Sequence, residues 1–139
     1  MNWFIRNFKW VMLVAGVLTF TMVQAAIAPQ SVLASTFGDS LEGPLAEIVV
    51  RSWGVLIALF GVMLIYGAYQ PQVRNLVLTV AGLSKVIFIS LIFTYGSQYL
   101  DKAGVVVVVD SVMVILFVTY LAAQAVPKQI IERAFHQTP

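Results

Sequence analysis

The sequence predicts an all-α fold, a bundle of four transmembrane helices with a short interfacial helix between the first and second spans. Of the 139 residues, 60% are hydrophobic and 10% are charged, whereas soluble chains carry about 25% charged residues. The mean hydropathy of +0.94 agrees with this composition. Four apolar stretches each approach the roughly 20 residues with which a helix crosses about 30 Å of hydrocarbon. We therefore expect one integral membrane domain over residues 1–139.

The four spans are expected where apolar residues run almost without interruption. Within the last of them, the valine run 105–109 is β-prone in water, but a lone strand in lipid would leave its backbone groups unpaired, so we expect a helix there too. The expected spans are residues 10–27, 47–69, 76–95 and 103–123.

The first stretch has a second interpretation. Arg6 and Lys9 precede an apolar run that ends in Ala26-Ile27-Ala28, a pattern that also fits a signal peptide with its cleavage site. The run is longer than most signal-peptide cores, which favours a retained transmembrane helix.

Prolines and glycines mark the connections. Pro29 opens and Gly38 closes a segment whose apolar residues alternate with polar ones, which predicts a short interfacial helix. Pro44 is expected near the start of the second span, and the segment 70–74 should be a tight turn between antiparallel helices. Pro127 marks the expected exit of the last helix.

Basic residues predict the orientation, because they tend to remain on the cytoplasmic side. With four spans, both termini share one side, and most of the lysines and arginines fall there. We therefore expect a multi-pass protein of a bacterial-type inner membrane with both termini in the cytoplasm. The basic residues on that side are Arg6, Lys9, Arg74, Lys128 and Arg133, against Arg51 and Lys102 on the other.

Two ionisable residues fall inside the expected spans. Lys85 stands near the middle of the third span and Asp110 is seven residues into the fourth. A charge near the bilayer centre costs about 2.5–3.5 kcal/mol on insertion scales, so such residues usually face the bundle interior and pair. Helices three and four are antiparallel neighbours, which predicts a Lys85–Asp110 ion pair. Arg51 is expected nearby, held either by Asp110 or by Glu47 four residues earlier.

The role of this pair has three interpretations. It can fix the register of the helices as a structural ion pair, bind a small ligand or lipid head group from the outer leaflet, or belong to a proton or ion path. The path is the weakest of the three, because no polar residue follows Asp110 along its helix until Thr119, apart from Ser111 beside it. Hydroxyl groups near the pair are expected to donate hydrogen bonds around it, from Ser84, Ser90, Thr94 and Ser111.

Small residues on the second span predict close helix packing. Gly54, Ala58 and Gly61 follow one another at spacings of four and three, which lets two helices approach closely in lipid. Packing within the chain is favoured over a homo-oligomer seam. Gly16 and Thr19 on the first span are among the residues that can face them.

Several classes of function lack the residues they need. There is no cysteine for disulfides, thiolate metal sites or a Cys nucleophile, and no basic run that predicts a nucleic-acid partner. His136 is the one histidine and lies after the last span, so neither a haem nor a zinc or di-iron site is expected. No catalytic residue, metal or cofactor is therefore assigned.

The first half of the chain resembles the DoxX-like group of small four-helix membrane proteins. The resemblance consists of a first span, then Pro29 with Val32-Leu33, then Phe37-Gly38, and a second span that opens on Arg51-x-x-Gly54. It implies a four-helix bundle, and members of the group include small subunits of quinone-linked redox complexes and assembly helpers. Arg51 and Gly54 carry over by position, whereas Lys85 and Asp110 match no motif of the group.

The sequence leaves three candidate functions. The first is a small non-enzymatic accessory or assembly component of a membrane complex, whose partners are the lipid bilayer and other membrane proteins or further copies of the chain. The alternative is a binding protein or enzyme subunit for a lipophilic or anionic small molecule, such as a quinone or a lipid head group, with a small transporter third. A cavity at Lys85 that holds something other than protein would favour the alternative, and a filled interior with an exposed Gly54/Gly61 face would favour the first.

Overall fold

A computed structural model describes the backbone of residues 2–136 and the side chains of residues 3–125. All of its regular structure is helical, so that the described residues contain no strand. Four segments of it are long and apolar enough to cross a membrane, which confirms the predicted all-α class. These segments are Trp3–Ile27, Pro44–Tyr69, Pro71–Tyr95 and Ser97–Ala125. The side chains of Lys128, Arg133 and His136 lie outside the described part.

The first span is interrupted near its end. Helix α1 (Asn2–Phe20) tightens into a 3₁₀ turn, η1 (Thr21–Val23), before the short α2 (Gln24–Ile27). Within this turn the hydroxyl of Thr21 donates to the carbonyl oxygen of Leu18 at 2.6 Å. Threonine hydroxyls that bond to the preceding turn compete with the regular helical pattern, which is consistent with the tightening here.

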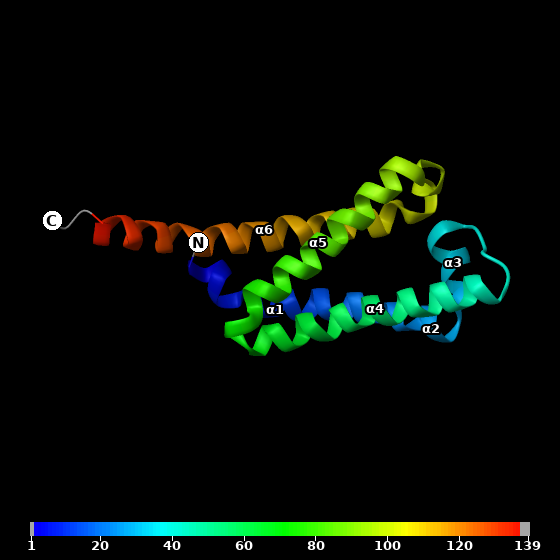
Figure 1. The fold of residues 1–139 in the computed structure, drawn as a ribbon, viewed down its shortest axis with the longest axis horizontal. Coiled ribbons are helices and arrows are strands. Elements are labelled where there is room, and N and C mark those ends of the chain that lie inside the picture. The colour runs from blue at the N-terminus through cyan, green and yellow to red at the C-terminus, as the bar shows by residue number, and fades with distance from the viewer. Residues whose placement is uncertain (1, 137–139) are drawn as a thin grey trace.

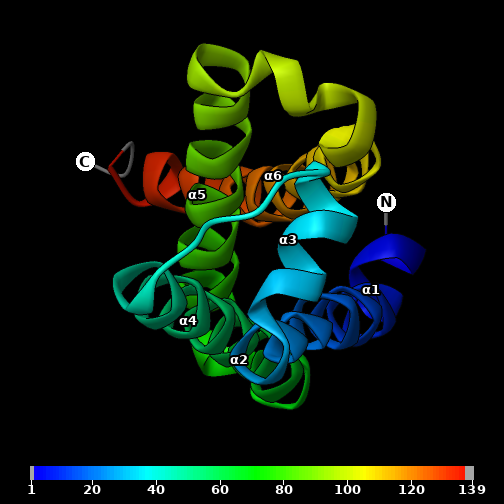
Figure 2. The same ribbon diagram turned by 90° about the vertical axis from the view of Figure 1, so that its right-hand side faces the viewer.

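The predicted interfacial helix is α3 (Pro29–Phe37). Pro29 occupies the first turn, where its missing N–H removes no helical bond, and Gly38 ends the helix in the left-handed conformation with φ 73°. The helix buries Pro29 and Leu33. Figure 2 shows α3 crossing the end of the bundle between α2 and α6.

The remaining spans are longer than predicted. They are α4 (Pro44–Tyr69), α5 (Pro71–Tyr95) and α6 (Leu100–His136), with the 3₁₀ turn η2 (Ser97–Tyr99) before α6. Pro44 and Pro71 stand in the first turns of their helices, where proline is favoured. The backbone of α6 continues past Pro127, contrary to the expectation that the helix ends there, because one proline removes a single hydrogen bond and the flanking turns keep theirs.

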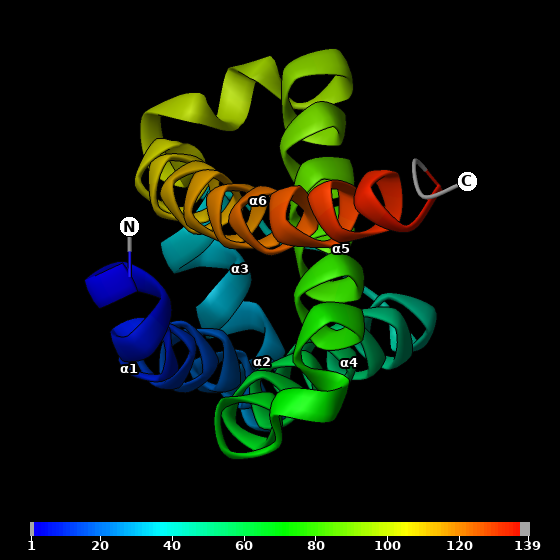
Figure 3. The same ribbon diagram turned by 90° about the vertical axis from the view of Figure 1, so that its left-hand side faces the viewer.

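The spans are arranged as two sides joined by an oblique helix. α1 and α4 lie side by side, α6 runs along the opposite side, and α5 crosses from the α4 side to the α6 side (Figures 1 and 3). The start of α1, the α4–α5 turn and the end of α6 lie at one end of the bundle. α3 and the α5–α6 turn lie at the other (Figure 1). We refer to these as the terminal end and the α3 end.

Glycines bring α1 and α4 into close contact. A Cβ atom on Gly61 would lie 2.5 Å from the backbone nitrogen of Phe20 and 2.7 Å from the carbonyl oxygen of Gly16. A Cβ on Gly54 would lie 2.6 Å from the Cβ of Ala25. Ala58, between them, is also buried. The small-residue face of α4 is therefore occupied by the first span of the same chain.

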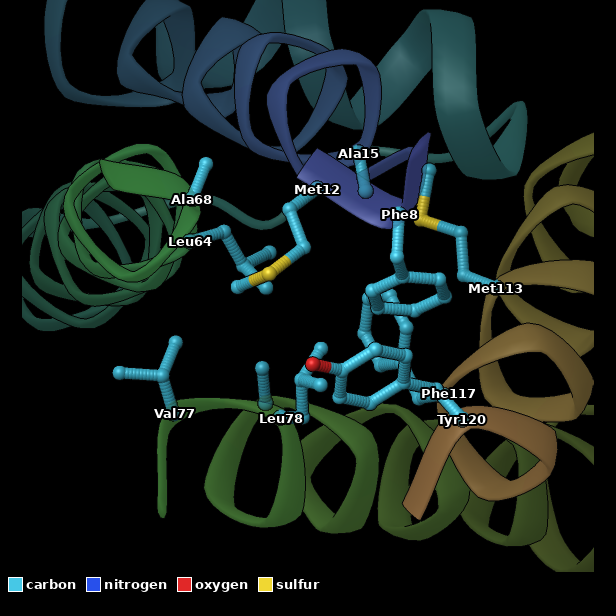
Figure 4. Packing of buried hydrophobic residues seen from close by; sticks show 11 residues of the cluster. Phe8, Met12, Ala15, Leu64, Ala68, Val77, Leu78, Met113, Phe117 and Tyr120 are labelled. Carbon is cyan, nitrogen blue, oxygen red and sulfur yellow. The ribbon is translucent and has the colours of Figure 1, made fainter. Parts of the chain in front are cut away.

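Apolar side chains from all four spans fill the terminal half of the bundle. Phe8 stacks on Tyr120 with ring centroids 4.0 Å apart, which ties α1 to α6. Figure 4 shows how these side chains meet in one cluster. The core cluster consists of Phe8, Met12, Ala15, Leu64, Ala68, Val77, Leu78, Ala81, Met113, Phe117 and Tyr120.

A candidate binding cavity around Lys85 and Asp110

Lys85 and Asp110 form an ion pair inside the bundle. The ammonium of Lys85, on α5, contacts Oδ1 of Asp110, on α6. Their side chains are 10% and 14% exposed, so both charges are largely withdrawn from the surroundings of the bundle. The contact predicted from the sequence is thus present, and the antiparallel α5–α6 packing produces it because the two residues reach the same depth.

The pair lies on the wall of a cavity of about 240 Å³. All four spans and α3 contribute side chains to this central cavity. Most of its lining is apolar, and the polar groups come from the ion pair, a serine, three threonines and the indole N–H of Trp53. The lining residues are Leu18, Thr19, Thr21, Met22, Thr36, Trp53, Ile57, Phe60, Leu64, Ala81, Ser84, Lys85, Phe88, Val105, Val106, Val109, Asp110 and Met113.

The core cluster closes the cavity toward the terminal end. Leu64, Ala81 and Met113 belong both to that cluster and to the cavity lining, so they form its floor. Thr36 reaches the cavity from α3 at the opposite end. The central cavity is therefore a pocket within the α3 half of the bundle.

Thr19 adds an unpaired polar group to this pocket. Thr19 is 6% exposed, and its hydroxyl has no hydrogen-bond partner among the described residues. Buried hydroxyls almost always form a hydrogen bond, and a buried hydroxyl without one costs about 1–3 kcal/mol. From the sequence, Thr19 was expected only to pack against the small residues of the second span. The two threonines at positions 19 and 21, within an apolar run, could have indicated a polar patch on the wall of a cavity.

Most of the other hydroxyls do not serve the pair as predicted. Ser90 donates to the carbonyl oxygen of Val86 at 2.8 Å, and Ser111 donates to that of Val107 at 2.7 Å, both within their own helices. Thr94 does the same at 2.7 Å. Polar side chains in an apolar helix satisfy themselves on the preceding turn when no other partner is in reach. Ser84 alone of the predicted set lines the cavity.

Arg51 takes the second of its two predicted positions. Its guanidinium lies 3.5 Å from Oε2 of Glu47, one turn earlier on α4, and donates to the carbonyl oxygens of Ala26 and Ile27. These are carbonyls at the end of α2, which the helix itself leaves unpaired. Arg51 is therefore a cap between α2 and α4, away from Asp110.

Arg74 has a similar role that the sequence did not reveal. Its Nε and Nη2 donate to the carbonyl oxygens of Gly67 and Ala68 at 3.1 and 2.9 Å. Its Nη1 donates to the hydroxyl of Tyr120 at 3.2 Å. One side chain at the start of α5 thus satisfies the end of α4 and holds α6 beside it.

The described residues contain no group of three or more acidic, histidine or cysteine side chains that could hold a metal ion. Comparison of the chain with protein-family models, curated proteins and solved structures gave no match. What the site can do chemically therefore rests on its own geometry: the ion pair and the buried, unpaired hydroxyl of Thr19, set in mostly apolar walls.

Proposed function

We propose that this membrane protein binds a lipophilic small molecule and holds its polar end against Lys85, Asp110 and Thr19. The central cavity carries this proposal, since it combines apolar walls with a few convergent polar groups, the usual composition of a small-molecule site. The unpaired hydroxyl of Thr19 supports it, because a ligand acceptor would satisfy that group. This is the second of the functions that the sequence left open.

The charge balance of the pocket limits the head group. Lys85 and Asp110 already neutralise each other, so an entering ion would add an uncompensated charge in a medium of low dielectric constant. A head group without net charge that accepts hydrogen bonds suits Lys85 and Thr19 better. A quinone ring and a zwitterionic lipid head group share this chemistry.

The competing proposal is a non-enzymatic accessory or assembly role in a membrane complex. The resemblance to DoxX-like proteins is compatible with both this role and ligand binding. The Gly54–Gly61 face does not favour a partner or homo-oligomer there, because α1 and α2 cover it. Transport is also disfavoured, since the floor of Leu64, Ala81 and Met113 interrupts a polar path from Asp110 to the terminal end.

The location belongs to the same proposal. Four apolar spans make contact with the lipid bilayer, and we place them in a bacterial-type inner membrane with both termini cytoplasmic. Arg6, Lys9 and Arg74 support this orientation, because all three lie on segments at the terminal end.

The test uses Trp53, which lines the cavity and reports on its contents. A protein with Trp3→Phe and Trp10→Phe retains Trp53 as its one tryptophan. The protein is titrated with decylubiquinone and, separately, with a lysophosphatidylethanolamine whose chain is brominated near the head group. The probe that binds should quench the fluorescence of Trp53 saturably. The two probes distinguish a quinone from a phospholipid source.

The control is a pair of variants. Lys85→Met with Asp110→Leu should abolish saturable quenching while the helix content and thermal unfolding stay close to the parent. Lys102→Met, which changes an exposed lysine at the start of α6, should leave quenching unchanged. Unsaturable quenching by both probes, equal in all variants, would refute the binding function and leave the pair a structural one.

A further inference from the structure

The central cavity is too small to hold a lipophilic ligand entirely. Its volume of about 240 Å³ lies below the roughly 300–1,000 Å³ of typical small-molecule sites. A molecule whose polar end sits at Lys85 and Asp110 must therefore extend into a neighbouring space. Among the described residues, two such spaces adjoin the cavity.

The first neighbouring space is a groove of about 480 Å³ between α1 and α6. Every residue that lines this α1–α6 groove is apolar. Leu18, Val109 and Met113 line both the groove and the central cavity, so these side chains lie between the two. α1 and α6 also pack against each other far less than α1 does against α4, which leaves this side of the bundle the more open to lipid.

The second neighbouring space has a different character. It lies at the α3 end, has a volume of about 360 Å³ and shares a single residue, Phe88, with the central cavity. Polar groups border it, among them Asp39, which accepts a hydrogen bond from the hydroxyl of Tyr99 at 3.1 Å. A hydrocarbon chain there would withdraw the charged carboxylate of Asp39 from water and would offer no hydrogen bond in exchange.

We infer that the ligand carries a single hydrocarbon chain that lies in the α1–α6 groove, and that it reaches the cavity from the bilayer through this side of the bundle. The inference rests on the proposed function and adds the class of the ligand and its route. A molecule dissolved in lipid reaches an apolar lateral groove without crossing water. Its polar end then displaces the side chains of Leu18, Val109 and Met113 and meets Lys85.

The experiment fills the groove without touching the cavity. Val112 lines the groove and is 51% exposed, whereas Val118 on the same helix is 58% exposed and lines neither space. Val112→Phe and Val118→Phe are thus matched in chemistry, helix and exposure. Calorimetric titration in detergent measures the affinity of each variant for decylubiquinone and for the same ring without its chain. A lysophosphatidylethanolamine and glycerophosphoethanolamine form the second pair of probes.

Val112→Phe should weaken binding of the chain-bearing probe about tenfold, equal to about 1.4 kcal/mol, and leave the chain-free probe unaffected. Val118→Phe should change neither. Equal affinities of both variants for the chain-bearing probe would overturn the inference while the proposed function stands. A loss caused instead by Leu91→Trp, in the space at the α3 end, would place the chain there. If none of the probes bound, the proposed function itself would be refuted.

Discussion

Replacement of Gly61 by alanine tests the packing on which the cavity depends. The added Cβ would lie 2.5 Å from the backbone nitrogen of Phe20 and 2.7 Å from the carbonyl oxygen of Gly16, and both are main-chain atoms that cannot rotate away. Ordinary van der Waals contact for a Cβ begins near 3.4 Å. The α1 backbone must therefore retreat from α4 by about 1 Å to accommodate the methyl group, since protein interiors are close-packed.

The expected cost follows from this displacement. Overpacking of a tight interior typically costs about 1–3 kcal/mol, and here the strain falls on main chain rather than on a flexible side chain. Leu18 and Thr19 lie directly before Phe20 and line the cavity, so the same movement should also weaken ligand binding. We expect Gly61→Ala to unfold more readily in detergent, measured by thermal and SDS titration, and to bind the probes less tightly.

Gly82 supplies the matched control, because it is a buried glycine in the middle of α5. A Cβ there would have its nearest neighbour, Cδ2 of Phe117, at 3.7 Å, which is ordinary contact. Gly82→Ala should therefore be neutral or stabilising, by up to about 1 kcal/mol, since alanine is the better helix former. If Gly61→Ala proved as stable as Gly82→Ala, the close α1–α4 contact and the cavity geometry built on it would be wrong.

Three further predictions concern polar groups. Lys85→Met alone should lower the free energy of unfolding by about 3–5 kcal/mol, because the carboxylate of Asp110 stays buried without its partner, and adding Asp110→Leu should recover most of the loss. Equal losses in the single and double variants would show that the charges do not interact. Thr19→Val should leave the ligand-free protein as stable or more stable by about 1 kcal/mol, because it removes an unpaired hydroxyl, and a clear loss in thermal unfolding would mean that the hydroxyl has a partner. Arg74→Met should destabilise by about 2–3 kcal/mol, and Arg74→Lys should restore only part, because an ammonium lacks the guanidinium fork that reaches two carbonyls and a phenol; full rescue by lysine would refute this cap.

The sequence anticipated the elements for reasons that act locally. Bilayer thickness sets the length of an apolar helix, and proline and glycine set where helices such as α3 begin and end. Pairing of Lys85 with Asp110 also followed from the sequence, since a short connection makes α5 and α6 neighbours and hydrocarbon penalises a lone charge.

Other features depend on contacts between distant segments. Arg51 had two acceptable partners by sequence, and only the position of the α2 carbonyls beside α4 selected Glu47 and the end of that helix. The acceptors of Arg74 likewise come from α4 and α6. The partner of a long side chain depends on which groups lie within its reach in the folded structure, and the spacing of residues along the chain does not give this.

By itself the sequence determined that the chain is a helical membrane protein, where its spans lie and that its buried cation needs an anion, because each of these follows from the free energy of placing residues in hydrocarbon. Only the tertiary structure decided that α1 covers the small residues of α4, that a cavity remains beside Lys85, and that Thr19 faces it without a partner. The cavity lies between side chains of four spans and α3, so its existence depends on how these helices pack and no single segment specifies it.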